Sequence, residues 1–285
     1  MSEKINLIYL LGAGRSGTTL LATLLNNHED IETLGEMNQF YEFLEQNKKC
    51  SCGDSLKNCS KWRAIINNLD SNVGYKRQFI EREEAHSQIP NLLIRKSIHK
   101  KYVNIQEEVF SNIHEHRNSK WYVDSSKYIA RYLLLKMSKK IRIKGIYLVR
   151  DPRGVVFSFQ KKVQTYKNQF NALAYYNIIN LFAEIVYRTD SNILKIRYED
   201  LVNKPEETLS KIYSHIFEQK IKAKTLPEFI ETPHIVGGNR MKVYKKIKIR
   251  RDVDWIRNQS KTQKISCYLF SFPFMLLNNY KAKKA

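Results

Sequence analysis

The sequence predicts an α/β fold of three layers, in which helices cover both faces of a central parallel sheet. Three observations support this prediction. Short apolar segments typical of buried strands alternate along the chain with segments of helical periodicity. Glycine-rich or charged residues follow directly after several of these strands. In α/β proteins, ligands bind at the carboxyl ends of parallel strands, which is where these residues are expected to lie.

The alternation begins at the N-terminus. Residues 5–11 are a continuous apolar run, which predicts a buried strand, and residues 18–25 are predicted to form a helix. A second short strand is predicted at 31–34. Residues 37–119 are more polar and are predicted to be a mostly helical insertion. We therefore expect residues 1–285 to form a single domain that carries this insertion.

After the insertion the alternation resumes. Further strands are predicted at 121–123, 145–149 and 193–198. Further helices are predicted at 128–140, from Pro152 through Ser158, at 169–189 and from Pro205 onward. Since strand–helix–strand connections are right-handed, these segments are expected to form one parallel sheet.

The predicted helix at 169–189 has apolar residues at spacings of three and four, which indicates an amphipathic helix that faces the core. These residues are Phe170, Leu173, Ala174, Ile178, Leu181, Phe182, Ile185 and Val186.

Composition excludes a disordered or low-complexity chain, because 42% of the 285 residues are hydrophobic and only 10 are Gly and 6 Pro. Lys and Arg number 49 against 28 Asp and Glu, a net charge of +21. This excess predicts an anionic partner, which can be nucleic acid, an anionic membrane surface or an anionic small ligand.

The N-terminus shows no secretory signal. The longest apolar run, 265–277, has 13 residues and contains Pro273, whereas a spanning helix needs about 20 residues. We therefore expect a cytoplasmic protein, soluble or peripheral. Because Lys281, Lys283 and Lys284 follow the run, a peripheral membrane contact is one alternative to a packed C-terminal helix.

A glycine-rich turn, Gly12-x-x-x-x-Gly17, connects the first strand to the first helix. This arrangement binds phosphate through backbone N–H groups at the helix N-terminus, so the fold is predicted to be P-loop-like. Nucleoside-triphosphate loops require Lys after the last Gly, and Thr follows here. The loop is thus expected to bind a different anion through Gly14, Arg15, Ser16, Gly17, Thr18 and Thr19.

Residues 14–20 resemble the 5′-phosphosulfate loop of sulfotransferases that use PAPS (adenosine 3′-phosphate 5′-phosphosulfate). The Arg-Ser-Gly-Thr-Thr form is more similar to the carbohydrate and tyrosylprotein branches than to the cytosolic branch. Residues 148–158 resemble the 3′-phosphate motif of the same family. Similarity continues at 197–205 and at 234–240, ahead of Asp254-Trp255.

The resemblance, which covers 5–36 and 121–258, implies PAPS as cosubstrate and adenosine 3′,5′-bisphosphate (PAP) as product. The acceptor is expected to be a hydroxyl of a carbohydrate, a glycolipid or a related compound, and residues 37–119 do not identify it. No nucleic-acid partner is implied. The residues implied for nucleotide binding beyond the loop are Arg150 and Ser158 at the 3′-phosphate, together with Tyr198, Asn239 and Arg240.

Sulfuryl transfer builds charge on the departing phosphate oxygen, so cations and N–H donors are expected there. Arg15 and Lys127 are predicted to stabilise the transition state, and Lys127 matches the family's transition-state Lys. Gly35-Glu36 resembles the position that supplies the base in the tyrosylprotein branch, so Glu36 is predicted to be the general base. The alternative for each of these residues is an ordinary surface or ion-pair role.

Two other functions remain open from the residues alone. One is a P-loop kinase-like phosphotransferase, for which only Asp124 and Asp151 are strand-end carboxylates able to hold Mg²⁺. The other is a non-catalytic basic module that binds nucleic acid or a membrane.

No metal is required by the predicted chemistry. Cys50, Cys52 and Cys59 lie within ten residues and could bind zinc if a His or Cys267 completed the set of four ligands. The spacing matches no common zinc motif. Free thiols or a disulfide are the alternatives, and the sequence does not decide between them.

Overall fold

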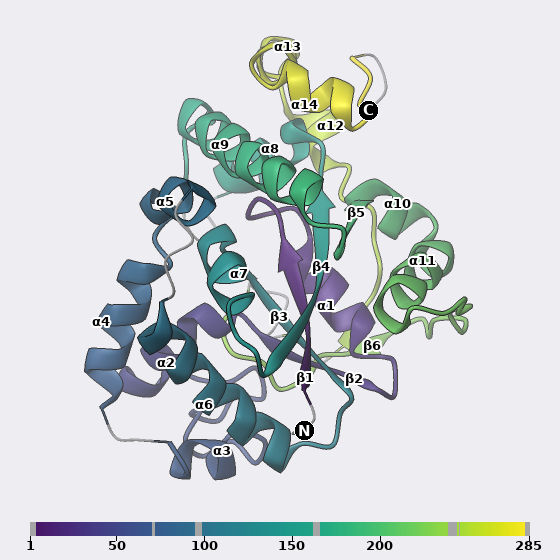
Figure 1. Cartoon of the computed structure of the whole chain (residues 1–285). Helices are drawn as coiled ribbons and strands as arrows, with labels where there is room; N and C mark the ends of the chain where they lie inside the picture. The colour runs from purple at the N-terminus through teal and green to yellow at the C-terminus, as the bar shows by residue number, and fades with distance from the viewer. Residues whose placement is uncertain are drawn as a thin grey trace. The chain divides into compact units, whose positions relative to one another are not determined.

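The computed structural model describes residues 4–69, 72–94, 99–161, 166–238, 244 and 246–282 (Figure 1). Its strands are β1 (Ile5–Leu11), β2 (Ile31–Gly35), β3 (Trp121–Lys127), β4 (Ile141–Val149), β5 (Ile193–Arg197), β6 (Ile230–Glu231) and β7 (Lys246–Ile247). Its helices up to β4 are α1 (Thr18–Leu25), η1 (Met37–Gln39), α2 (Phe40–Glu45), α3 (Arg63–Asn67), α4 (Val73–Glu83), η2 (His86–Gln88), α5 (Ile89–Ile94), α6 (Lys100–His116) and α7 (Ile129–Leu135). Those after β4 are α8 (Pro152–Gln160), α9 (Gln169–Thr189), α10 (Tyr198–Asn203), α11 (Pro205–Phe217), α12 (Asp254–Asn258), α13 (Lys261–Phe270) and α14 (Phe272–Leu277).

The first five strands form one sheet in the order β2-β3-β1-β4-β5, while β6 and β7 form a small antiparallel pair. Strands β1 and β2 both run parallel to β3. The alternation of strands with helices along the chain confirms the predicted α/β class.

Most predicted elements are present, and the main differences lie around β3 and β4. Strand β3 continues past the predicted end at 123 to Lys127, and β4 begins at Ile141 rather than 145. The predicted helix at 128–140 is therefore shortened to α7. The polar end of β3 lacks the apolar pattern that predicts a buried strand. Its side chains are nevertheless buried, and hydrogen bonds satisfy their polar atoms. Helix α10 was not predicted.

The chain divides into two compact units, each built from separate stretches of sequence. The first comprises Met1–Leu11, Thr19–Gly145 and Phe229–Ile247. In it, β1 and β2 flank β3, with Leu11 opposite Lys127 and Gly35 opposite Asp124. The described part of 37–119 supplies helices η1 to α6 to this unit (Figure 1).

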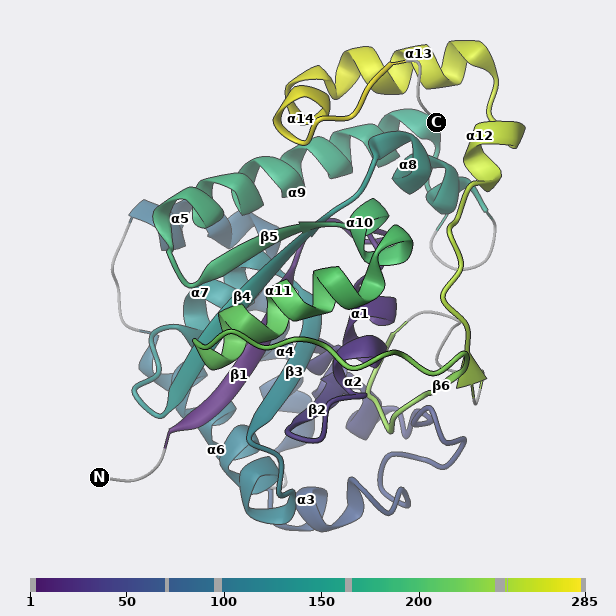
Figure 2. The same cartoon turned by 90° about the vertical axis from the view of Figure 1, so that its right-hand side faces the viewer.

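The second unit comprises Gly12–Thr18, Ile146–Glu228 and Lys248–Ala285. It contains the glycine-rich loop, the carboxyl-terminal part of β4, β5 and the helices from α8 to α14. Helix α8 starts with Pro152 at its first position, and the Asp151 side chain accepts a hydrogen bond from the Arg153 N–H as its N-cap. Figure 2 shows α13 lying alongside α9 in this unit.

Helix α9 has the predicted bounds, but its predicted core face is only partly correct. Leu173 and Val186 are buried, whereas Phe170, Ile178, Leu181 and Ile185 are 72%, 51%, 52% and 38% exposed. The buried face is instead completed by Ala172, Tyr176, Ile179 and Ala183. Because α9 is apolar around most of its circumference, spacing alone did not identify the buried side. Helix α9 has two apolar stripes, and the one that contains Phe170, Ile178, Leu181 and Ile185 faces solvent.

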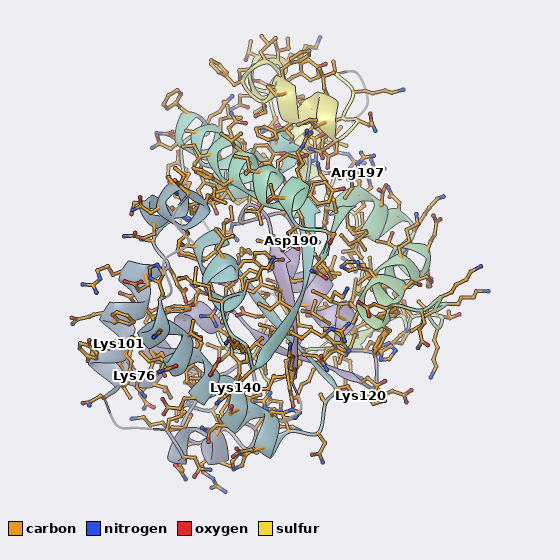
Figure 3. The ribbon with its side chains drawn as sticks, in the orientation of Figure 1. Lys76, Lys101, Lys120, Lys140, Asp190 and Arg197 are labelled. Carbon is orange, nitrogen blue, oxygen red and sulfur yellow. The ribbon has the colours of Figure 1, made fainter. Side chains whose placement is uncertain are left out.

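Several lysines of the first unit are labelled in Figure 3, and two of them, Lys76 and Lys120, pair with carboxylates. Lys76 lies 2.9 Å from Glu108, and Lys120 lies 3.0 Å from Asp30. Exposed pairs such as Lys120–Asp30 contribute little to stability. Within the described residues, no helix combines the length and apolar character needed to span a membrane.

Candidate active site

The glycine-rich loop joins β1 to α1 and requires glycine at both ends. Gly12 and Gly17 have φ angles of +132° and +100°. A Cβ atom at Gly12 would lie 2.3 Å from the Leu148 carbonyl oxygen, and one at Gly17 would lie 2.5 Å from Cδ2 of Tyr198. Arg15 also has a positive φ, +71°, which is uncommon for a residue with a side chain. The backbone at Gly12 and Gly17 is therefore one that residues with a side chain would not adopt.

The side chains of the loop fit an anionic ligand. Ser16 is fully buried, and its Oγ atom has no hydrogen-bond partner among the described residues. Thr18 and Thr19 are 4% and 7% exposed, and the Arg15 guanidinium lies 5.6 Å from the centre of the Phe159 ring. A buried hydroxyl without a partner is costly unless a ligand or water satisfies it. The loop thus offers the donors that the sequence predicted for a phosphate group.

Arg150 at the end of β4 contacts this loop. Its Nη1 atom donates to the Arg15 carbonyl oxygen at 2.9 Å, and its Nη2 atom donates to Asp252 Oδ2 at 2.9 Å. The guanidinium lies 4.5 Å from the centre of the Tyr198 ring. The structure therefore brings together three residues predicted for nucleotide binding, Arg15, Arg150 and Tyr198.

Asp252 was not predicted and belongs to the same group. Burial alone would raise the pKa of its carboxyl, but Arg150 and Lys161 outweigh burial and lower the pKa below its ordinary value. Asp252 is therefore a charged competitor for the Arg150 guanidinium. Its signal in the sequence was weak, because only Asp254-Trp255 in this region belonged to a recognised motif.

Ser158 lies half-buried on α8, two turns after the start of the helix. Asn239 and Arg240 lie outside the described residues, so the structure does not place them.

Glu36 and Lys127 form an ion pair at the carboxyl ends of β2 and β3. Lys127 Nζ lies 2.6 Å from Glu36 Oε1, and the two side chains are 16% and 14% exposed. Lys127 also donates to the Ser125 carbonyl oxygen at 3.0 Å, and Gln39 donates to Glu36 Oε2 at 2.7 Å. Because Lys127 pairs in register with Leu11, the pair lies beside the last residue before the glycine-rich loop.

A buried polar network holds the turn that carries Glu36. Asp124 Oδ1 accepts hydrogen bonds from the backbone N–H of Ser126 at 2.9 Å and of Met37 at 3.4 Å. The Ser126 hydroxyl accepts the Asn38 N–H at 2.9 Å. The polar end of β3 therefore positions both members of the pair. In the sequence Asp124 is recognisable only as a candidate magnesium ligand, because its bond to the Met37 N–H joins distant segments.

Arg131 on α7 connects this network to the helices of residues 37–119. It donates to Asp124 at 2.8 Å and to Glu84 at 2.6 Å, and all three side chains are at most 3% exposed. The Tyr102 hydroxyl donates to Glu84 at 2.6 Å. Burial raises the pKa of the Glu84 carboxyl even though Arg131 opposes this effect. The helices of the described part of 37–119 are thus connected to β3 through Arg131 and Glu84.

Comparison with known proteins identifies the family of the chain. The profile of the sulfotransferase family matches residues 8–218, which is most of the chain. The chain belongs to the sulfotransferase family. This membership confirms the enzyme class and the cosubstrate predicted from the sequence, a PAPS-dependent sulfotransferase. No curated protein sequence matches the chain significantly.

Two solved structures are similar to this sulfotransferase. A mouse sulfotransferase, SULT7A1, crystallised with PAP, is 13% identical, with 97% of this chain and 89% of that chain covered and a TM-score of 0.50. The sulfotransferase domain from the curacin biosynthetic pathway is 24% identical, with 78% of this chain and 76% of that chain covered and a TM-score of 0.46. At 13% identity the likeness to SULT7A1 concerns the fold, and it confirms the P-loop-like architecture predicted from the glycine-rich loop.

Proposed function

We propose that this sulfotransferase transfers a sulfuryl group from PAPS to a hydroxyl of a carbohydrate or glycolipid, with Glu36 as general base. The observation that carries the proposal is the Glu36–Lys127 pair at 2.6 Å, at the strand ends and next to the residue that precedes the glycine-rich loop. A base and a cation are the two groups that sulfuryl transfer to a hydroxyl requires.

Each residue has a defined role in this proposal. PAPS, when bound, supplies the activated sulfuryl group. Glu36 accepts the proton of the acceptor hydroxyl on a carboxylate oxygen. Lys127 releases the carboxylate and donates to the oxygen that gains charge as the bond to sulfur breaks. The resemblance assigns Arg15 to the stabilisation of the same charge. The buried network around Asp124 keeps Glu36 and Lys127 at fixed strand ends, so little reorganisation is needed.

Arg150 is proposed to bind the 3′-phosphate of the nucleotide, with Ser158, Tyr198, Asn239 and Arg240 contributing. Two parallel N–H donors suit a phosphate group, and the guanidinium is already stacked on Tyr198. One of its donors is bonded to Asp252. The phosphate is therefore expected to compete with this carboxylate for the guanidinium.

Arg150→Ala is expected to weaken binding of PAP more than binding of adenosine 5′-phosphate. Charged hydrogen bonds contribute about 1.5–3 kcal/mol each, which corresponds to roughly 10- to 150-fold in affinity for PAP. Isothermal titration calorimetry with both nucleotides measures the difference. Asp252→Asn is the matched control, because it removes the competing charge and should leave PAP binding as tight or tighter. An equal loss for both nucleotides in Arg150→Ala would show that Arg150 acts on the loop and not on the 3′-phosphate.

A phosphotransferase would need a strand-end carboxylate to hold Mg²⁺, and Asp124 and Asp151 were the two candidates. The contacts of both carboxylates disfavour this function. Asp124 is bonded to Arg131 in a pair whose side chains are both 0% exposed. Asp151 is bonded to Arg153 at 2.6 Å, also in a buried pair. Both carboxylates are neutralised by arginine, so neither is available to hold Mg²⁺.

We further propose that the acceptor is presented at an anionic membrane surface, which favours a glycolipid. Large apolar side chains on α9, α13 and α14 are exposed, namely Phe170, Ile178, Leu181, Ile265, Leu269, Phe270, Phe272, Leu276 and Leu277. Six Lys or Arg and no Asp or Glu follow Asp254 in the sequence. Exposed apolar side chains combined with a purely basic segment suit the interface of an anionic bilayer.

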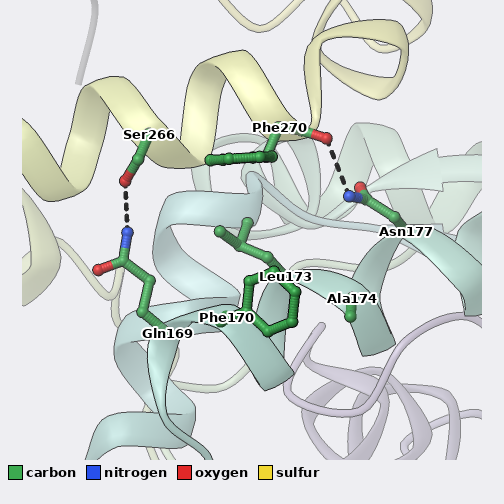
Figure 4. A pocket seen from close by; sticks show the side chains of 7 residues that line it. All are labelled: Gln169, Phe170, Leu173, Ala174, Asn177, Ser266 and Phe270. Carbon is green, nitrogen blue, oxygen red and sulfur yellow. Dashed lines mark hydrogen bonds between the residues drawn. The ribbon is translucent and has the colours of Figure 1, made fainter.

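The same surface contains a small apolar hollow between α9 and α13. Its volume is about 250 Å³, and Phe170, Leu173 and Phe270 line it (Figure 4). Two hydrogen bonds, Gln169 to Ser266 and Asn177 to the Phe270 carbonyl oxygen, hold the helices on either side. The hollow is consistent with a surface that takes up part of an acyl chain.

The membrane proposal predicts cosedimentation with vesicles. The protein is expected to pellet with vesicles of phosphatidylcholine and phosphatidylserine and much less with pure phosphatidylcholine. Phe270→Ser combined with Leu269→Ser should reduce pelleting, whereas the control Tyr75→Ser, also at an exposed aromatic residue but on the first unit, should not. Equal pelleting of both variants would contradict the proposed surface.

The reaction itself is tested with ³⁵S-labelled PAPS and a panel of acceptors that includes free saccharides, glycolipids in vesicles and a simple phenol. Label is expected on saccharide or glycolipid hydroxyls. Thermal shift gives an independent readout, in which PAP raises the melting temperature while ATP with Mg²⁺ and duplex DNA do not. Stabilisation by ATP and Mg²⁺ alone, or label only on the phenol, would contradict the proposal.

A further inference from the structure

Three cysteines and one histidine from distant parts of the sequence meet in the first unit. The Sγ atoms of Cys50, Cys52 and Cys59 and a ring nitrogen of His234 all lie within 4.8 Å of one another. Cys52 Sγ lies 3.7 Å from Cys59 Sγ, and Cys59 Sγ lies 3.2 Å from His234 Nδ1. His234 thus completes the set of four that the sequence left open, while Cys267 belongs to the other unit.

The four ligand atoms are close enough together to surround one metal ion, and one of their separations can be compared directly with a tetrahedral site. With Zn–S bonds of about 2.3 Å, the ligand atoms of such a site are about 3.8 Å apart. The observed 3.7 Å between two sulfurs agrees with that edge. A disulfide would instead need an S–S separation of about 2.0 Å. All four cysteines of the chain are free thiols in the structure.

The backbone around the thiols is folded as a compact turn that suits thiolates. The Cys50 N–H donates to the Asp54 carbonyl oxygen at 2.8 Å, and the Gly53 N–H donates to the Cys50 carbonyl oxygen at 3.0 Å. The N–H groups of Cys52 and Asp54 are directed at the sulfurs of Cys50 and Cys52 respectively. Backbone donors of this kind stabilise metal-bound thiolates and orient them.

His234 is held in place by contacts that do not involve its ring. The Ser51 hydroxyl donates to the Pro233 carbonyl oxygen at 2.5 Å and accepts the Ile235 N–H at 2.9 Å. The fully buried Trp62 donates from Nε1 to the His234 carbonyl oxygen at 3.3 Å. The imidazole is therefore presented to the thiols by a preformed scaffold.

We propose that Cys50, Cys52, Cys59 and His234 bind one structural Zn²⁺ ion. Three thiolates and one imidazole are a common zinc ligand set, and soft sulfur ligands disfavour Mg²⁺ and Ca²⁺. Four protein ligands leave no open position, so the ion stabilises structure and does not activate water. Arg117 lies near the thiols, with its guanidinium 4.2 Å from the centre of the Trp62 ring, and it is ion-paired with Glu32 at 2.9 Å.

The ion would fix the chain segment next to the candidate base. The segment that follows His234 forms a parallel bridge with β2, and the Glu36 N–H donates to the Val236 carbonyl oxygen at 2.7 Å. The Val236 N–H donates to the Leu34 carbonyl oxygen at 2.9 Å. Zinc would thus attach the loop of residues 50–62 to the strand segment that holds the Glu36 backbone. The metal site itself does not depend on the proposed function.

Metal analysis of the purified full-length chain tests the site directly. Mass spectrometry of metals is expected to give about one zinc per chain, because the four ligands form one closed site. Titration of the thiols with a mercurial reagent in the presence of a zinc indicator should release that zinc. Substitution with Co²⁺ should give the intense visible bands of tetrahedral thiolate coordination. A chain that contains no zinc when produced in zinc-supplemented medium, or a Cys52–Cys59 disulfide in the native protein, would overturn the proposal.

Variants separate metal binding from folding. Cys52→Ser changes an exposed thiol and should lose most of its zinc, whereas Cys267→Ser, a control outside the cluster, should keep it. His234→Cys should retain zinc with four sulfur ligands and shift the Co²⁺ bands. Zinc retained at full stoichiometry in Cys52→Ser would contradict the ligand assignment. If Cys52→Ser fails to fold, His234→Cys and the Co²⁺ spectrum of the unaltered chain still show whether these four residues bind the metal.

Discussion

Glu36→Gln is expected to reduce turnover by about 10²- to 10⁴-fold, the usual contribution of a general base. The amide keeps the size of the side chain and can still accept a hydrogen bond from Lys127, but it cannot take the proton of an acceptor hydroxyl. Nucleotide binding should survive, because the glycine-rich loop and Arg150 are unchanged. Initial rates with ³⁵S-labelled PAPS and the best acceptor of the panel, together with calorimetric titration of PAP, measure the two quantities separately.

The chain offers a closely matched control for this variant. Glu184 pairs with Lys195 at 2.6 Å, and the two side chains are 10% and 15% exposed, which resembles the Glu36–Lys127 pair. Glu184→Gln is expected to leave turnover within a few fold, because this pair lies at none of the predicted site residues. A fully active Glu36→Gln enzyme, or equal losses in both variants, would remove Glu36 from the role of base.

The parts of the site that could be predicted from the sequence are those encoded by adjacent residues. The loop from Gly12 to Gly17 is recognisable because glycine is required where the backbone turns with positive φ or approaches Leu148 and Tyr198. Strand β1 and helix α1 have their predicted bounds because the apolar run and the helix after it are local patterns. Glu36 and Lys127 were predicted from their positions just after strands together with the resemblance to family motifs, and their catalytic roles stay predictions.

What the sequence could not provide are contacts between distant segments. Nothing in the spacing of Glu36 and Lys127, 91 residues apart, indicates that they form an ion pair. His234 is 175 residues from Cys59, and several histidines could have completed the cysteine cluster. The burial of one face of α9 is equally non-local, since the choice between two apolar stripes depends on the elements that pack against the helix.

The polar end of β3 is a further case in which contacts between distant segments decide the structure. Asp124-Ser125-Ser126 resembles a solvated loop in sequence, yet all three residues are buried. Arg131 and Met37 donate to Asp124, and Asn38 donates to Ser126. Burial of a carboxylate is tolerated only with such partners. The partners come from α7 and from the turn after β2, so the strand can be recognised only in the folded chain.

Arg131→Met is expected to destabilise the protein by about 3–5 kcal/mol, because it leaves two buried carboxylates without their cation. Asp124 and Glu84 both bond to Arg131, and their side chains are 0% and 3% exposed. Urea denaturation at pH 7.5 measures the loss. Arg188→Met is the control, since Arg188 pairs with Glu184 but is 61% exposed, and a change below about 1 kcal/mol is expected there.

The pH dependence of the Arg131→Met loss distinguishes the charge from the shape of the side chain. Burial already raises the folded-state pKa of Glu84 above its unfolded value, and removing Arg131 removes a cause that lowers it. A raised pKa means that the folded state binds the proton more tightly, so the folded variant gains stability as the pH falls through that pKa towards the unfolded value. The deficit relative to the unaltered chain should therefore be smaller at pH 5.5 than at pH 7.5. A stability deficit that stays constant between these pH values would indicate lost packing rather than an unpaired carboxylate. Arg131→Lys retains a cation. If the charge is responsible, Arg131→Lys should lose less stability than Arg131→Met.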